Sequence, residues 1–174
     1  MDFSEVIRTR RSVRAFKRDP IPEDVLSRVL NAARVAPSGS NRQPWRFILV
    51  TDEALKQKMI SACNNQEFVA QAPVFVVACG QKMPINRGGY MGEMSMLLDV
   101  AIAFTHLVLA ARAEGLGTCW IGAFNNGEIK KLLYIPAEYE VVAATPLGFP
   151  ENENAFSQTS KRKTLDEAVS TNKF

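Results

Sequence analysis

The sequence predicts a single α+β domain of 174 residues in which helices cover a mixed central sheet. Hydrophobic residues make up 47% of the chain and charged residues 22%, as in ordinary globular domains. Segments with apolar residues at helical spacing mix with short apolar runs, without the strict strand–helix–strand rhythm of a parallel α/β protein. No internal repeat, low-complexity segment or linker is visible, so we expect one domain over residues 1–174.

Six helices are expected from apolar spacing and from signals at the helix ends. The second begins at Ile21–Asp24, where proline and acidic residues occupy the first turn, and it ends before Pro37. The longest is expected over 92–114. It is apolar on most sides, as a helix inside a core should be, and Gly115 and Gly117 end it. The other five expected helices are 2–9, 54–62, 92–114, 126–133 and 164–169, with 92–114 the longest.

Strands are expected where short runs of β-forming residues lie between turn signals. Val74–Ala78 is a continuous apolar run, which is typical of a buried central strand. Residues 81–91 are expected to form a loop, and 151–160 a polar, irregular segment. The other expected strands are 46–50 and 139–147, with a short extended piece at 119–122.

Composition excludes several classes of protein. The net charge of +3 is small, and three widely spaced cysteines without a CxxC motif make no disulfide framework. His106 is the only histidine, so a site with two histidine ligands is impossible; we expect it to be structural. There is no HExxH, GxSxG or P-loop motif and no visible secretory signal. Residues 96–111 are judged too short and too polar for a bilayer span, so a cytoplasmic protein is expected.

Two basic segments are the first candidates for a binding site. Six basic residues lie within 8–18; arginine forks match phosphate oxygens, and Ser12 adds a hydroxyl donor. On charge alone a solvated basic helix end is the favoured interpretation, but Val13 and Phe16 can anchor the segment and orient its arginines. The cluster at 161–163 is solvated if it stands alone, and would complete a phosphate clamp if paired with the first.

Two loops are rich in small residues. Residues 36–45 contain Asn41 and Gln43, whose amides both donate and accept, although such residues are also the usual formers of turns. In residues 115–123 the glycines can simply cap the long helix, or Gly122 can let a flat ring lie against the backbone. The chain otherwise offers no convincing nucleophile or acid–base pair. We therefore expect no catalytic side chain and chemistry supplied by a cofactor.

Taken in order, these segments resemble the FMN-dependent nitroreductase family over nearly the whole chain. One such motif would be weak, but five in the right order are a specific signal. The segments that carry the resemblance are 10–14, 36–45, 66–73, 115–122 and 162–167. The resemblance implies a sheet with helices on both faces and an intertwined homodimer holding two FMN molecules at its interface. It also implies electron transfer from NADH or NADPH to an organic acceptor, such as a nitroaromatic or quinone, by a ping-pong mechanism.

The resemblance also assigns roles to residues of this chain. One group would hold the FMN phosphate and ribityl chain, a second would reach the FMN from the partner subunit, and a third would lie at the ring. The first group is Arg10, Arg11, Ser12, Arg14 and Arg162, with Lys161 helping; the second is Ser38, Ser40 and Asn41; the third is Gln66, Ile121 and Gly122. Whether Lys161, Arg162 or Lys163 contacts phosphate stays open. Between the strand near Val77 and the long helix, only the short segment Gly80–Met91 can form a lid.

Two other functions compete with this one. Relatives within the family include dehalogenases, flavin-consuming enzymes and oxidases of peptide heterocycles, so the FMN can serve another task. Alternatively the basic arm at 8–18 makes the protein a non-enzymatic module for nucleic acid or another polyanion. The modest net charge and the lack of exposed-looking aromatic residues among the basic ones disfavour that module.

Overall fold

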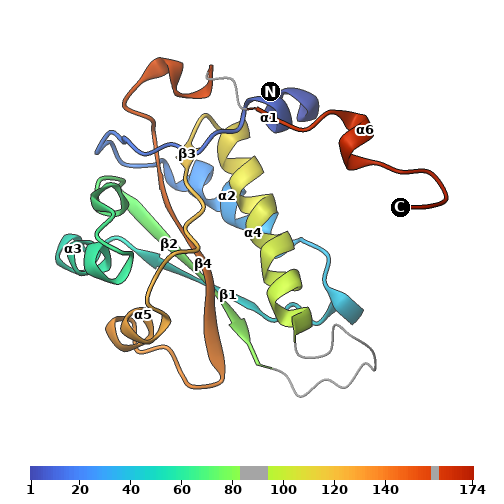
Figure 1. Ribbon diagram of the computed structural model, residues 1–174. Coiled ribbons are helices and arrows are strands. Elements are labelled where there is room, and N and C mark those ends of the chain that lie inside the picture. Colours follow the sequence, from blue (N-terminus) through green and yellow to red (C-terminus); the bar gives the residue numbers. More distant parts are fainter. Residues whose placement is uncertain (83–93, 158–160) are drawn as a thin grey trace.

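The computed structural model describes residues 1–82, 94–157 and 161–174 (Figure 1). Four strands form one sheet in the order β1-β2-β4-β3, and all three ladders between them are antiparallel. The strands are β1 (Trp45–Val50), β2 (Val74–Gln81), β3 (Gly117–Thr118) and β4 (Tyr139–Gly148). The helices are α1 (Phe3–Thr9), α2 (Glu23–Arg34), α3 (Glu53–Ala62), α4 (Ser95–Ala113), α5 (Asn126–Leu132) and α6 (Leu165–Ala168). Short 3-10 turns lie at Gly39–Asn41, Glu67–Ala70 and Glu153–Phe156.

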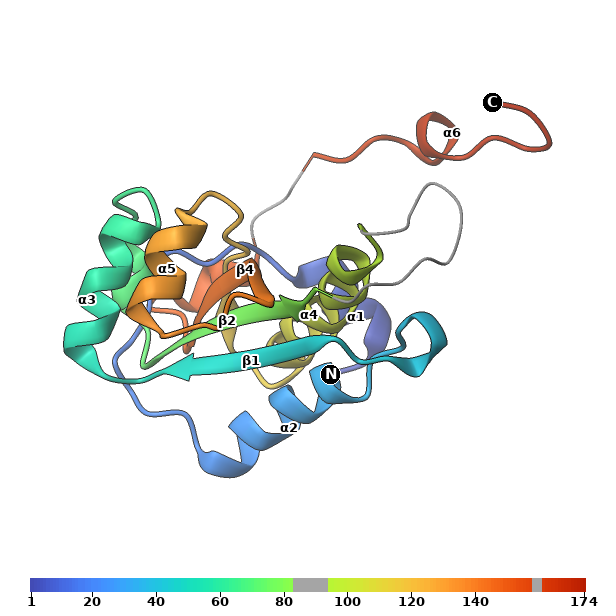
Figure 2. The ribbon, with the colours of Figure 1, turned by 90° about the horizontal axis from the view of Figure 1, so that it is seen from below.

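Helices cover both faces of this sheet, as Figure 2 shows for α3 and α5 on one side and α2 on the other. The alternation of side chains along β2 explains the two layers. Val74, Val76 and Ala78 pack against α2 and α4. Phe75 and Val77, which point the opposite way, pack against α3 and α5. The α+β architecture predicted from sequence is confirmed, and the parallel bridge of Ser12 with Thr118 adds the mixed character to the sheet.

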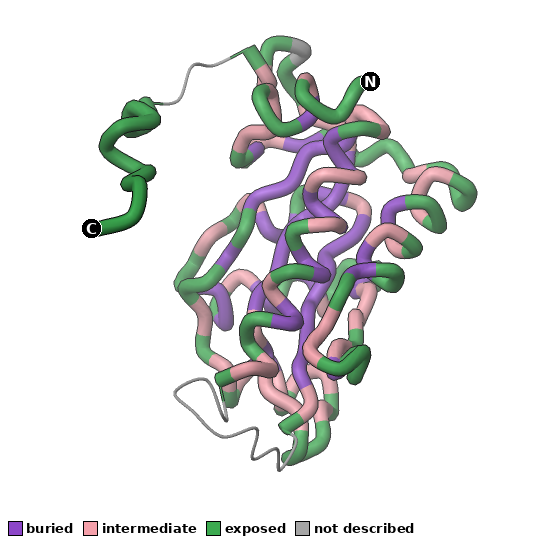
Figure 3. Tube along the Cα trace, turned by 90° about the vertical axis from the view of Figure 1, so that its right-hand side faces the viewer, coloured by how far each residue is buried: buried purple, intermediate pink, exposed green. Residues whose placement is uncertain are grey.

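Helix α4 is the central helix of the first layer. Its length and apolar composition would by themselves allow a membrane span, so the sequence argument from length was wrong. However, one such helix is weak evidence for a span, and 44% of its apolar window is buried inside the fold. Val100, Phe104 and Leu107 are fully buried against the sheet. Figure 3 shows this buried interior between exposed outer turns.

The expected elements agree with the structure except at their ends. The long helix begins at Ser95, and the first residues of its expected range, 92 and 93, lie outside the described residues. Most of the expected lid, 83–91, lies outside them too. The extended piece expected at 119–122 is represented by strand β3 just before it and by the bridge of Ile121 with Ala144. Residues 161–174 are exposed throughout and extend away from the body of the chain (Figures 2 and 3).

Candidate functional site

The basic segment begins where α1 ends, and that end is fixed from two sides. The Asp2 side chain caps the first turn of α1 by accepting from the Ser4 amide at 2.8 Å. At the other end, buried Arg112 of α4 donates from Nε to the Thr9 hydroxyl at 3.0 Å. The same guanidinium lies 3.9 Å from the centroid of the Phe156 ring. Arg112 therefore ties the start of the basic segment to the part of the chain that precedes 161–163.

After α1 the segment lies along β3. The Val13 amide donates to the Thr118 carbonyl at 2.8 Å, and Ser12 forms a parallel bridge with Thr118. Val13 and Phe16 are buried, at 5% and 6% exposure, so they anchor the segment as the sequence analysis expected. Gly117 permits this close approach, because a Cβ there would lie 2.9 Å from the Val13 side chain. The segment is thus a packed part of the fold and not a free basic arm.

Three guanidinium groups gather at this segment. Burial lowers the pKa of Arg10, and the nearby positive charges of Arg162 and then Arg11 lower it further. The Arg11 group donates to the carbonyls of Arg8 and Arg10, both at 2.8 Å, at the carbonyl end of α1. Arg162, from the exposed C-terminal segment, therefore lies close to Arg10, 152 positions earlier in the chain. An arrangement in which like charges disfavour one another is suited to an anion.

Ser12 and Arg14 extend this cluster toward Cys119. Arg14 lies with its guanidinium 6.0 Å from the centroid of the Phe68 ring. Burial raises the pKa of the Cys119 thiol, although Arg14 and a hydrogen bond with Ser12 act in the opposite direction. Because the thiolate is the reactive form, Cys119 is expected to be inert here. The side chains of Ser12 and Arg14 are exposed and accessible to a ligand.

Gln66 lies beside Ala123, the residue that follows the motif at 115–122. Its amide nitrogen donates to the Cys63 carbonyl at 2.8 Å and reaches the Ala123 carbonyl at 3.5 Å. The Ile121 side chain is buried in the core, and its N–H and C=O are both paired with Ala144. Gly122 is exposed, and a Cβ placed there would meet nothing within 4 Å. Of Ile121 and Gly122, which were both expected at the ring, Gly122 is therefore the one that offers open backbone.

The loop that carries Ser38, Ser40 and Asn41 lies elsewhere. It is attached near the start of α4, where the Gly39 amide donates to Asp99 at 2.9 Å. Arg112, which holds the basic segment, is thirteen positions later in α4. At 1.5 Å per residue, the two attachment points are about 20 Å apart. The fold thus gathers Arg10, Ser12, Arg14 and Arg162 but keeps this loop away from them within one chain.

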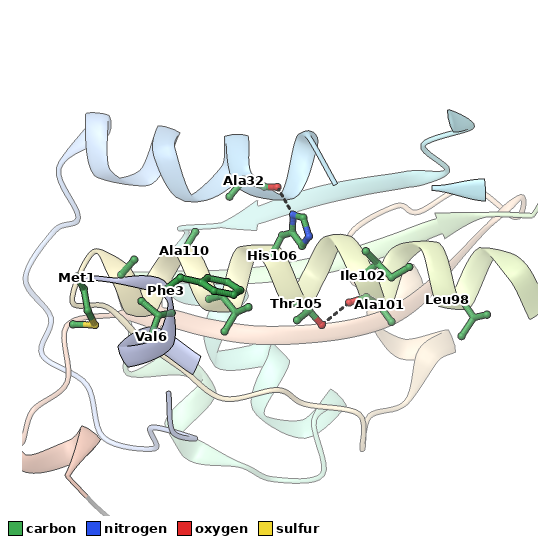
Figure 4. Close-up of a pocket in the computed structure, with 12 residues that line it drawn as sticks. Met1, Phe3, Val6, Ala32, Leu98, Ala101, Ile102, Thr105, His106 and Ala110 are labelled. Carbon is green, nitrogen blue, oxygen red and sulfur yellow. Dashed lines mark hydrogen bonds between the residues drawn. The ribbon is translucent and has the colours of Figure 1, made fainter. Parts of the chain in front are cut away.

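An apolar groove of about 770 Å³ runs along α4 between α1 and α2 (Figure 4). Phe3, Leu98 and Ile102 contribute large exposed side chains to its wall. His106 also lines it, and its Nδ1 lies 3.3 Å from the Ala32 carbonyl of α2. This contact fits the structural role expected for the histidine.

Sequence reasoning assigned no role at the site to the two residues that position these segments. Asp99 and Arg112 are buried polar residues within a helix identified as core, and neither belongs to a motif. An ionisable residue inside an apolar helix is a usable signal, because burial of a charge has to be compensated. Its partner, however, becomes visible only in three dimensions.

Comparison with known proteins agrees with this geometry. The model of the Nitroreductase family matches residues 7–82 and 57–149. A solved nitroreductase family protein from Clostridium novyi NT is 40% identical with a TM-score of 0.81, over 89% of this chain and 88% of that one. A 5,6-dimethylbenzimidazole synthase from Rhodospirillum rubrum is 32% identical, over 87% of this chain and 83% of the relative. An NADH dehydrogenase from Thermus thermophilus is 30% identical, over 88% and 89%. The chain therefore belongs to the nitroreductase family.

Proposed function

We propose that this protein is an FMN-dependent oxidoreductase that passes electrons from NADH or NADPH to an organic acceptor such as a nitroaromatic or a quinone. The observation that carries the proposal is the packing of the arginine segment against β3, through the Val13–Thr118 hydrogen bond and the Ser12–Thr118 bridge, with Arg162 near Arg10. A phosphate monoester carries nearly two negative charges at neutral pH and three acceptor oxygens. Such a group would favour the charged form of Arg10, whose pKa is lowered first by burial and then by the positive charges of Arg162 and Arg11.

The residues around the cluster suit the rest of an FMN molecule. Ser12 and Arg14 are exposed beside the arginines and can bind the phosphate and ribityl chain. Gln66 offers an amide and Gly122 an uncovered backbone for the ring. Lys161 is exposed next to Arg162 and adds a further positive charge at the phosphate.

The position of the small-residue loop supports a homodimer. Ser38, Ser40 and Asn41 are attached to α4 about 20 Å from the point where Arg112 holds the basic segment, so in this proposal they serve a flavin held by the partner subunit. The apolar groove along α4 provides a surface to bury between subunits, since large exposed apolar patches mark interaction sites. The exposed segment 161–174 carries Leu165 and Val169 one helical turn apart. A helix of four residues is not stable alone, so we expect α6 to pack these side chains against the partner subunit.

Catalysis in this proposal requires no ionisable side chain at the reacting atoms. FMN, when bound, would supply the redox chemistry that carries reducing equivalents from the nicotinamide to the organic acceptor. The arginines hold the phosphate and fix the cofactor's position. The exposed backbone at Gly122 would offer a donor where negative charge develops on a reduced ring. Donor and acceptor bind in turn, which predicts ping-pong kinetics.

The deciding experiment compares FMN with riboflavin, which has the same ring but no phosphate. We expect the purified protein to be yellow, to release FMN on denaturation and to bind FMN at least tenfold more tightly than riboflavin. Anaerobic mixing with NADH or NADPH should bleach the flavin, and a nitroaromatic or quinone should restore its colour. A colourless protein that binds nucleic acid but not FMN would replace this function with polyanion binding.

The similarity to a 5,6-dimethylbenzimidazole synthase supports a second candidate, a flavin-linked oxidation in which the flavin serves another task. The same experiment separates the two candidates. FMN binding without reduction by either nicotinamide would favour the second, and rapid reduction followed by reoxidation with an organic acceptor would favour the first.

A further inference from the structure

Asp99 is the only acidic side chain that is buried among the described residues, with 9% exposure. It lies in the second turn of α4, and its Oδ1 accepts a hydrogen bond of 2.9 Å from the Gly39 amide. The bond joins two parts of the chain 60 positions apart. A buried carboxylate is costly unless it is hydrogen-bonded, so this contact is part of the reason that Asp99 is tolerated in the core helix.

The loop that Asp99 holds has an unusual backbone. Ser40, Asn41 and Gln43 have φ angles of 51°, 55° and 52°, in the left-handed region that disfavours residues with a Cβ. Residues in such conformations persist when their surroundings determine them, and they concentrate at sites that clamp ligands. Three of them within four positions need several restraints.

Most of those restraints come from within the loop. The Ser38 hydroxyl accepts from the Gln43 amide at 2.9 Å. The Gln43 side chain donates to the carbonyl and the side-chain oxygen of Asn41, both at 3.1 Å. These bonds fix the loop's internal shape but not its direction relative to the body of the protein. In the described part of the chain, Asp99 is the only side chain outside the loop that is hydrogen-bonded to it.

We propose that Asp99 is a positioning residue for the flavin site. By holding the Gly39 amide it directs Ser38, Ser40 and Asn41 toward the FMN of the partner subunit. The inference rests on the proposed function, because it takes the loop to be part of an FMN site. Asp99 itself contacts neither cofactor nor substrate.

The test uses two substitutions at this position and one control on the same helix. Asp99→Ala removes the acceptor, and Asp99→Asn keeps a side-chain oxygen in its place. Val108→Ala truncates another buried α4 side chain that packs in the core, away from the loop. We expect Asp99→Ala to raise the Kd for FMN about tenfold, the loss typical of one charge-assisted hydrogen bond, and Asp99→Asn to restore binding to within about threefold. Val108→Ala should lower the Tm while changing the Kd less than about twofold.

A measurement without flavin separates the parts of the argument. In the apo protein, Asp99→Ala should speed hydrogen exchange of the Gly39 amide, and neither Asp99→Asn nor Val108→Ala should do so. If the unmodified protein binds no FMN, the proposed function fails, and the positioning role fails with it. If it binds FMN and Asp99→Ala behaves like Val108→Ala, the function stands and the positioning role is wrong. Weak binding by Asp99→Asn with a protected Gly39 amide would also overturn it.

Discussion

At the scale of single residues, the site is defined by positive charges brought close together. Arg10 is half-buried beside Arg11 and Arg162, and both neighbours disfavour its charge. A cluster of like charges of this kind is suited to binding an anion. Arg18, four positions after Arg14, is exposed and lies outside the matched motif.

Arg10 and Arg14 should therefore matter for FMN in a way that Arg18 does not. Substituting Ala at both Arg10 and Arg14 should weaken FMN binding by at least tenfold, because two guanidinium partners of the phosphate are lost. Arg18→Ala should change the Kd less than about twofold. Fluorescence titration with FMN and with riboflavin measures both effects. Equal losses in the double variant and in Arg18→Ala, or equal losses for both ligands, would contradict the phosphate clamp.

The buried cysteines make a separate prediction about pH. Burial raises the pKa of Cys63 and of Cys79 to about 11, from an ordinary 9.0. A group whose pKa is higher in the folded state favours folding below its unfolded pKa and loses that contribution as pH rises through its folded pKa. The free energy of unfolding should thus decline between about pH 9 and pH 11. Urea unfolding across this range, compared with a variant carrying Ala at both positions, should show a shallower decline in the variant.

At the scale of elements, the basic segment packs closely against β3. A Cβ at Gly117 would lie 2.9 Å from three atoms of Val13, so Gly117→Ala should push the segment off the strand. We expect a loss of about 1–3 kcal/mol in stability, the usual cost of overpacking, together with weaker FMN binding.

Gly127→Ala is the matched control for that substitution. Gly127 lies in α5, and the nearest atom to a Cβ there is 3.6 Å away, an ordinary contact. Its stability should stay the same or rise, since Ala favours helix over Gly. Thermal unfolding and FMN titration of both variants give the comparison. If Gly117→Ala were as stable as Gly127→Ala, the segment would not be held against β3 as described.

The elements also show which features of the structure the sequence patterns predict. Val74–Ala78 predicts the central strand correctly, because a strand covered on both faces has to be apolar along its whole length. The motif at 10–14 could be identified, but its direction depends on Arg112, which lies about a hundred positions later. The attachment of the Ser38–Asn41 loop to Asp99 is hidden for the same reason. Local periodicity determines elements, whereas contacts between distant polar residues depend on the packed fold.

At the scale of the whole molecule, a single chain exposes apolar side chains on two surfaces. The groove along α4 is apolar and accessible, with Leu98 49% and Ile102 39% exposed. The C-terminal segment, 161–174, exposes Leu165 at 74% and Val169 at 58%. A second copy would cover both kinds of surface by the hydrophobic effect. In the proposed function, it would also bring the Ser38–Asn41 loop to the flavin of the partner subunit.

This coupling of assembly to cofactor binding gives the last prediction. Ile102→Asp places a charge in the groove, where burial in an interface would be costly, so the dimer should dissociate. Because the loop would then reach no partner flavin, FMN should be released along with the subunits. Tyr134→Asp is the control, since Tyr134 is 92% exposed and lies outside the groove. Light scattering after size-exclusion chromatography gives the mass, and flavin absorbance in the same peak gives the occupancy. A monomeric Ile102→Asp protein that keeps its FMN would show that each chain completes its own site.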